Sequence, residues 1–89
     1  MFVLMVYDVN VDRVNKVLKT GRKYLNHIQN SVLEGELSNA QLKSLKYEIK
    51  EIINEDQDCV RFYLLRTTHY LKVEEMGTPS RPGASGDFL

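Results

Sequence analysis

An apolar run near the start of the sequence, FVLMVYD from Phe2 to Asp8, constrains the fold more than any other segment. Apolar or aromatic side chains follow one another without interruption, which is typical of a strand that is buried on both faces. Asp8 is the first charged residue. A carboxylate at the end of a central strand is suited to ending the strand, capping a helix or binding a metal ion, and the local sequence leaves these roles open.

Composition limits the class of protein. A chain of 89 residues has room for one domain with a single core. Its 12 basic and 12 acidic residues give a net charge of zero, so nucleic-acid binding would have to come from local charge. Cys59 is the only cysteine, which excludes an internal disulfide and a multi-cysteine zinc site. No apolar segment is long enough to span a membrane, and we expect a soluble cytoplasmic protein.

A first amphipathic helix is predicted after Asp8, with Asn10 or Asp12 as its N-cap. Its apolar side carries Val14, Val17, Leu18, Tyr24 and Leu25. Basic residues cover much of the other side: Lys16, Lys19, Arg22 and Lys23. This basic side fits either a solvated helix face or a surface that binds phosphates.

A second helix has the clearest start signal in the sequence. Ser38 and Gln41 have the spacing of a capping box, and Leu37 is placed to pack on Leu42 as a hydrophobic staple. Apolar residues then follow at helical spacing: Leu42, Leu45, Ile49, Ile52 and Ile53. We interpret the acidic residues around its end as solvated surface or as a contact for a basic partner: Glu51, Glu55, Asp56 and Asp58.

The remaining segments predict strands and a tail. Strands are expected at Leu25–Gln29, Val32–Glu36, Cys59–Leu65 and His69–Met76, with Arg66–Thr68 as a turn. From Gly77 onward the sequence GTPSRPGASGDFL holds both prolines, so residues 77–89 are predicted to be a flexible tail beyond a domain of residues 1–76.

The order strand, helix, strand, strand, helix, strand predicts an α+β, ferredoxin-like βαββαβ sandwich, here with an extra C-terminal strand. Right-handed crossovers would place both helices on one face of the sheet and the first strand at its centre. The other sheet face would lack a helical cover, which favours a homodimer.

Three features together resemble a known family. The strand end Tyr7-Asp8, the basic first helix and the stretch QNSVLEGELS at Gln29–Ser38 look like the smaller of the two universal CRISPR adaptation proteins. The resemblance covers residues 1–76. Leu33 departs from it, since the family often has phenylalanine after the Ser-Val pair.

The resemblance implies a homodimer whose sheets face each other and whose final strands extend the sheet of the other subunit. Such a dimer bridges the larger integrase partner, of the Cas-one family, and holds a duplex of protospacer DNA. It also implies a nuclease that cleaves RNA or DNA with Mg²⁺ or Mn²⁺. Asp8 of each subunit would be the catalytic residue and metal ligand, and the nucleic-acid-binding residues would be Arg13, Lys16, Lys19, Arg22 and Lys23.

Other interpretations remain open. The same fold serves stand-alone ribonucleases of the toxin type and ligand-binding regulatory domains. Neither His27 nor His69 has a carboxylate at a sequence spacing that would indicate a general base, so we interpret both as structural or surface residues. Ser31 lacks the setting of a serine nucleophile and fits a turn, and Cys59 is interpreted as a small buried hydrophobe.

Overall fold

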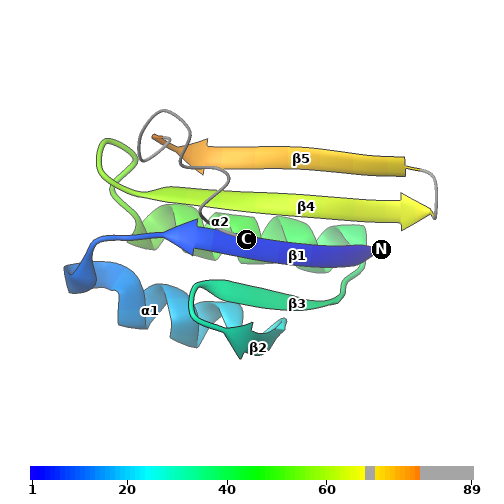
Figure 1. The fold of residues 1–89 in the computed structure, drawn as a ribbon, viewed down its shortest axis with the longest axis horizontal. Coiled ribbons are helices and arrows are strands. Elements are labelled where there is room, and N and C mark those ends of the chain that lie inside the picture. The colour runs from blue at the N-terminus through cyan, green and yellow to red at the C-terminus, as the bar shows by residue number, and fades with distance from the viewer. Residues whose placement is uncertain (68–69, 79–89) are drawn as a thin grey trace.

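The computed structural model describes residues 1–67 and 70–78. Within them the elements are β1 (Phe2–Asp8), α1 (Val11–Gly21), β2 (Asn26–Gln29), β3 (Val32–Glu36), α2 (Asn39–Ile52), β4 (Cys59–Thr67) and β5 (Tyr70–Gly77). The strands form one antiparallel sheet in the order β2-β3-β1-β4-β5. Both helices lie on the same face of this sheet (Figure 1). The predicted ferredoxin-like α+β fold with an extra strand is therefore confirmed.

Strand β1 is the central strand, as the apolar run predicts. It pairs along its length with β3 on one side and with β4 on the other. Val3, Met5 and Tyr7 are buried in the core that contains the apolar side chains of the helices. Because side chains alternate along a strand, Phe2, Leu4, Val6 and Asp8 point to the opposite face, which is called the open face below.

Helix α1 begins where the sequence predicts and ends earlier. The side chain of Asn10 accepts a hydrogen bond from the backbone N–H of Asp12 at 3.0 Å and caps the helix. The helix stops at Gly21, whose carbonyl accepts from the backbone N–H groups of Tyr24 and Leu25 at 3.0 and 2.8 Å. The apolar pattern of the sequence extends to Leu25 because Leu25, although it lies in the turn after the helix, packs in the core.

Helix α2 has the predicted capping box. The Ser38 hydroxyl accepts from the backbone N–H of Gln41 at 3.1 Å, and the Gln41 side chain accepts from the backbone N–H of Ser38 at 2.9 Å. Leu37 and Leu42 are both buried in the core, as expected of a hydrophobic staple. None of the helices in the described part of the chain is long and apolar enough to cross a membrane.

The turn between β2 and β3 confirms the structural role of Ser31. Its φ is 65°, in the left-handed region, and its carbonyl accepts a hydrogen bond from the backbone N–H of Tyr7 at 3.0 Å. Strand β2 begins at Asn26, one residue later than predicted. The hydrogen bond between Tyr7 and Ser31 attaches the turn to the central strand, one residue before Asp8.

Strand β5 lies at one edge of the sheet and pairs with β4 of the same chain. It continues through Gly77, after which the backbone N–H of Thr78 donates to the carbonyl of Asp58 at 2.9 Å. Extension of a second subunit's sheet by this strand stays a prediction. The prediction of a turn at Arg66–Thr68 is wrong for its first two residues, because β4 continues through Thr67. Residues 68–69 and 79–89 lie outside the described residues, and with them Thr68, His69 and most of the predicted tail.

Candidate metal and nucleic-acid site

Asp8 is exposed at the end of the central strand, on the open face of the sheet. Its partner across the ladder is Cys59, the first residue of β4. Tyr7 points the other way and is only 3% exposed within the core, so it packs and does not line the same surface as Asp8. The ladder fixes the backbone of Asp8 while its carboxylate faces solvent.

The rest of the open face carries an apolar patch. Cross-strand pairing places Leu4, Tyr63 and Val73 in one row across β1, β4 and β5. A second row consists of Phe2, Leu65 and Leu71. Leu65, Leu71 and Val73 are 39%, 58% and 48% exposed, although leucine and valine are among the residue types most often buried. Asp8 and this apolar patch therefore share one face.

A polar row separates Asp8 from the apolar patch. Arg61 Nε donates to Glu75 Oε2 at 2.8 Å, and the thiol of Cys59 lies 3.6 Å from the same oxygen. Burial, with Glu75 nearby, raises the pKa of the Cys59 thiol to about 11. The thiol is protonated at neutral pH, and Cys59 is the small buried hydrophobe that the sequence predicts.

Asp58 corrects one sequence-based interpretation. Glu51, Glu55 and Asp56 are exposed as expected, but Asp58 has no exposed surface at all. Burial alone would raise the pKa of Asp58, yet hydrogen bonds from Arg13 and from the backbone N–H groups of Asn10 and Asn54 lower it to about 2. The prediction failed because composition alone grouped Asp58 with its acidic neighbours. Its signal was topological, since the β1–α1 and α2–β4 connections meet at the same end of neighbouring strands in a βαββαβ sheet.

The predicted nucleic-acid-binding residues separate into three groups. Lys16 and Lys19 on α1 and Arg22 at its C-cap are exposed and make no ion pair within residues 1–67 and 70–78. Lys23 pairs with Glu48 of α2, which raises the pKa of the ammonium group. Arg13 is turned toward Asp58 and pairs with it. Lys23 is exposed as well, whereas Arg13 is partly buried against Asp58. Nucleic-acid binding by these residues stays a prediction.

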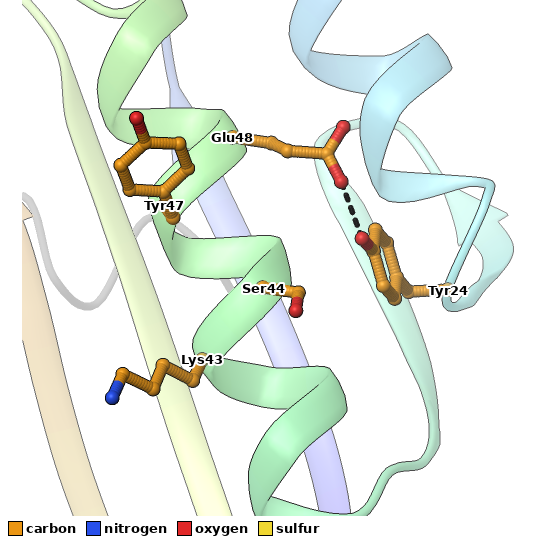
Figure 2. A pocket seen from close by; sticks show the side chains of 5 residues that line it. All are labelled: Tyr24, Lys43, Ser44, Tyr47 and Glu48. Atoms are coloured by element: carbon orange, nitrogen blue, oxygen red, sulfur yellow. Dashed lines mark hydrogen bonds between the residues drawn. The ribbon is translucent and has the colours of Figure 1, made fainter.

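Glu48 of α2 is hydrogen-bonded to the turn that follows α1. Its carboxylate accepts a hydrogen bond from Lys23. It also accepts one from the hydroxyl of Tyr24, in a pocket that Lys43, Ser44 and Tyr47 line as well (Figure 2). These hydrogen bonds lower the pKa of Glu48. The carboxylate therefore holds the turn after α1 against α2.

The carboxylate of Asp8 fits a hard divalent cation. Mg²⁺ prefers oxygen ligands, retains several waters and is commonly held by one or two carboxylates together with substrate phosphates. Within the described residues there is no group of three or more acidic, histidine or cysteine side chains that could hold a metal ion. His27 is exposed on β2 and His69 lies outside the described residues. A metal at Asp8 therefore needs ligands from water, from substrate or from a second subunit.

Known proteins share this chain's sequence and fold. A family model described as CRISPR associated protein Cas2 matches residues 1–73. The CRISPR-associated endoribonuclease Cas2 of Dictyoglomus turgidum is 58% identical over 77 residues, which cover 86% of this chain and 88% of the relative. The crystal structure of a Cas2 protein is 50% identical, covers 79% of each chain and superposes with a TM-score of 0.72. The Streptococcus pyogenes Cas2 crystal structure at pH 6.5 is 38% identical, covers 73% of this chain and 86% of its own, and gives a TM-score of 0.68. The resemblance found in the sequence is therefore confirmed, and the chain belongs to the CRISPR-associated Cas2 family.

Proposed function

We propose that this protein is a CRISPR adaptation protein with metal-dependent endoribonuclease activity, and that it works as a homodimer. Relatives that cover most of the chain carry the name CRISPR-associated endoribonuclease. One observation carries the proposal: an exposed carboxylate, Asp8, lies on the same uncovered sheet face as an apolar patch. A second copy that buried this patch would share the face with Asp8.

The homodimer follows from the uncovered patch. The patch extends across β1, β4 and β5. Its exposed members are Leu65, Leu71 and Val73, and its partly buried members are Phe2, Leu4 and Tyr63. A contiguous apolar surface of this kind marks an interface more often than a free surface. A two-fold axis through the open face makes the patch self-complementary and brings one Asp8 from each subunit to the same interface.

In the proposed mechanism, the Asp8 carboxylates of the two subunits would hold Mg²⁺ or Mn²⁺. A bound divalent ion would lower the pKa of a water ligand and neutralise charge that develops on the phosphodiester. The β1–β4 ladder holds the backbone of Asp8 in place. The apolar patch excludes water from the neighbouring interface.

Asp8→Asn tests the enzymatic part. The amide keeps the size of the side chain and removes the charge that would bind the metal, so RNA cleavage in Mg²⁺ should fall by at least ~100-fold. The control is Asp12→Asn, an exposed carboxylate in the first turn of α1. Cleavage retained in Asp8→Asn, or lost equally in both variants, would contradict the assignment.

We further propose that the dimer binds the backbone of duplex protospacer DNA and bridges subunits of the Cas-one integrase. The supporting observation is the exposed basic stripe of α1, formed by Lys16, Lys19 and Arg22. Removal of one basic side chain that touches a phosphate should lower the slope of log affinity against log salt by about one.

A duplex-binding titration checks this adaptor role. Lys16→Gln, Lys19→Gln and Arg22→Gln should each weaken binding and reduce the salt slope, whereas Lys43→Gln on α2 serves as the matched control. Co-purification with the integrase tests the bridge directly. RNA cleavage that needs no integrase, with no duplex binding, would instead identify a toxin-type ribonuclease. Stabilisation by a small molecule without nucleic-acid affinity would identify a regulatory domain.

A further inference from the structure

Asp58 lies at the centre of a buried set of hydrogen bonds at the Asp8 end of the sheet. Its Oδ1 accepts from the backbone N–H of Asn10 at 2.9 Å and from Arg13 Nη2 at 3.0 Å. Its Oδ2 accepts from Arg13 Nε at 2.6 Å and from the backbone N–H of Asn54 at 2.8 Å. Both oxygens are therefore fully used, and the Arg13 fork binds them in a bidentate manner.

These hydrogen bonds join the turn that follows Asp8 to the residue that precedes β4, the strand paired with Asp8. Asn10 lies two residues after Asp8 and starts α1, while Asp58 immediately precedes Cys59, the ladder partner of Asp8. The carbonyl of Asn10 also accepts from the backbone N–H of Arg13 at 2.9 Å, so the guanidinium and the turn are fixed together. The ladder therefore holds Asp8 directly, and the hydrogen bonds of Asp58 hold the turn that follows Asp8.

Arg13 is oriented toward Asp58 and not toward a solvent-side phosphate. Its side chain is 22% exposed, and its Nη2 donates to Gln57 Oε1 at 3.1 Å as well as to Asp58. Lys16 and Lys19, one and two turns further along α1, are exposed. Arg13 therefore differs from Lys16 and Lys19, because its side chain contacts Asp58 and Gln57.

We propose that Arg13 and Asp58 are positioning residues that fix the β1–α1 turn and thereby the direction of the Asp8 carboxylate. This inference rests on the proposed role of Asp8 as a metal ligand. Groups that orient a metal ligand typically change metal affinity or activity by about 10- to 100-fold when they are removed. Arg13 and Asp58 act through Asp8 and touch neither metal nor substrate.

The alternative role of Arg13, as a phosphate ligand, predicts effects of a different sign. If Arg13 bound phosphate, Asp58→Asn would release it and tighten RNA binding, whereas Arg13→Lys would raise the KM for RNA. If the pair positions Asp8, both substitutions weaken metal binding and lower kcat while the KM for RNA stays the same. The double variant should then be no worse than the more damaging single variant, because both remove one unit.

The experiment compares Arg13→Lys, Asp58→Asn and the double variant in the full chain. Arg13→Lys keeps the charge but removes the bidentate fork, and Asp58→Asn turns an NH2 group toward two N–H donors. Glu74→Gln is the matched control, because Glu74 Oε1 pairs with Lys46 Nζ at 2.5 Å on the helix-covered side of the sheet. Readouts are Mn²⁺ affinity by calorimetry, kcat and KM for RNA, thermal unfolding, and amide exchange at Asn10 by NMR.

We expect Mn²⁺ affinity and kcat to fall about 10- to 100-fold in both single variants, with faster exchange at the Asn10 amide and no such change in Glu74→Gln. Unchanged Mn²⁺ affinity with raised KM, or an equal loss in Glu74→Gln, would overturn the positioning role. If Asp58→Asn does not fold, Arg13→Lys decides the question alone. A wild-type protein that neither binds Mn²⁺ nor cleaves RNA contradicts the proposed function, while unchanged Asn10 exchange in a folded variant contradicts the positioning role separately.

Discussion

At the scale of single residues, Asp58 is the residue whose surroundings matter most for the candidate site. It is a carboxylate without exposed surface, yet its charge is retained because one guanidinium and two backbone N–H groups replace water. A buried charge is tolerated when it is paired and fully hydrogen-bonded, and removing one partner is strongly destabilising. The Asp8 end of the sheet therefore depends on the ionisation of Asp58.

Acid should weaken the fold through Asp58. The pKa of Asp58 is lowered to about 2 from its ordinary value of 3.8, so its contribution is complete above about pH 4 and disappears as pH falls toward 2. This contribution is roughly 1 to 2 kcal/mol after allowance for solvent screening. Urea unfolding between pH 6 and pH 2 checks this. The stability difference between wild type and Asp58→Asn should shrink across this window, and a constant difference would refute it.

Gly77 is predicted to be irreplaceable at the end of β5. Its φ is +88°, and a Cβ there would lie 1.9 Å from the carbonyl oxygen of Asp58. Gly77→Ala should lower the free energy of unfolding by at least about 2 kcal/mol, since backbone must move. In Gly35→Ala the added Cβ would meet the end of the Leu25 side chain first, at 3.2 Å. Thermal unfolding should rank Gly77→Ala well below Gly35→Ala, and equal melting temperatures would contradict the clash.

At the scale of elements, the start of α2 provides the most local prediction. Ser38→Ala removes the cap that accepts from Gln41 N–H and should cost about 1 kcal/mol. Ser44→Ala, at an exposed position within the same helix, should have little effect or stabilise slightly because alanine is the better helix former. Chemical denaturation of both variants gives the comparison. A loss in Ser44→Ala as large as that in Ser38→Ala would rule out the cap as the cause.

The elements also explain what the sequence could predict. Local signals, such as the capping box at Ser38 and the apolar run of β1, identified elements correctly because their physical causes lie within a few neighbouring residues. The end of α1 was placed too late, because Tyr24 and Leu25 keep an apolar pattern while serving a turn. Arg13 and Asp58 are 45 residues apart in the chain, so no local sequence signal predicts their pairing, which depends on the fold bringing the two loops together.

At the scale of the whole molecule, the candidate site depends on the face that the helices leave uncovered. The helices cover one side of the sheet (Figure 1), so the described chain buries Val3, Met5 and Phe62 fully but leaves Leu71 and Val73 half exposed. The same asymmetry places Asp8 where a second copy would lie. Assembly and metal binding are therefore coupled in the proposed function.

A charge in the apolar patch should separate the subunits without unfolding them. Val73→Glu puts a carboxylate in the row with Leu4 and Tyr63, where a dimer would bury it without a partner, so the interface should weaken by at least ~100-fold in Kd. Sedimentation velocity should find a dimer for wild type and a monomer for Val73→Glu, with unchanged circular dichroism. Tyr47→Glu is the control, since Tyr47 is 67% exposed on α2 and lies outside the patch. A Val73→Glu dimer, or a Tyr47→Glu monomer, would place the interface elsewhere. RNA cleavage should disappear together with the dimer in Val73→Glu, because the proposed metal site takes one Asp8 from each subunit.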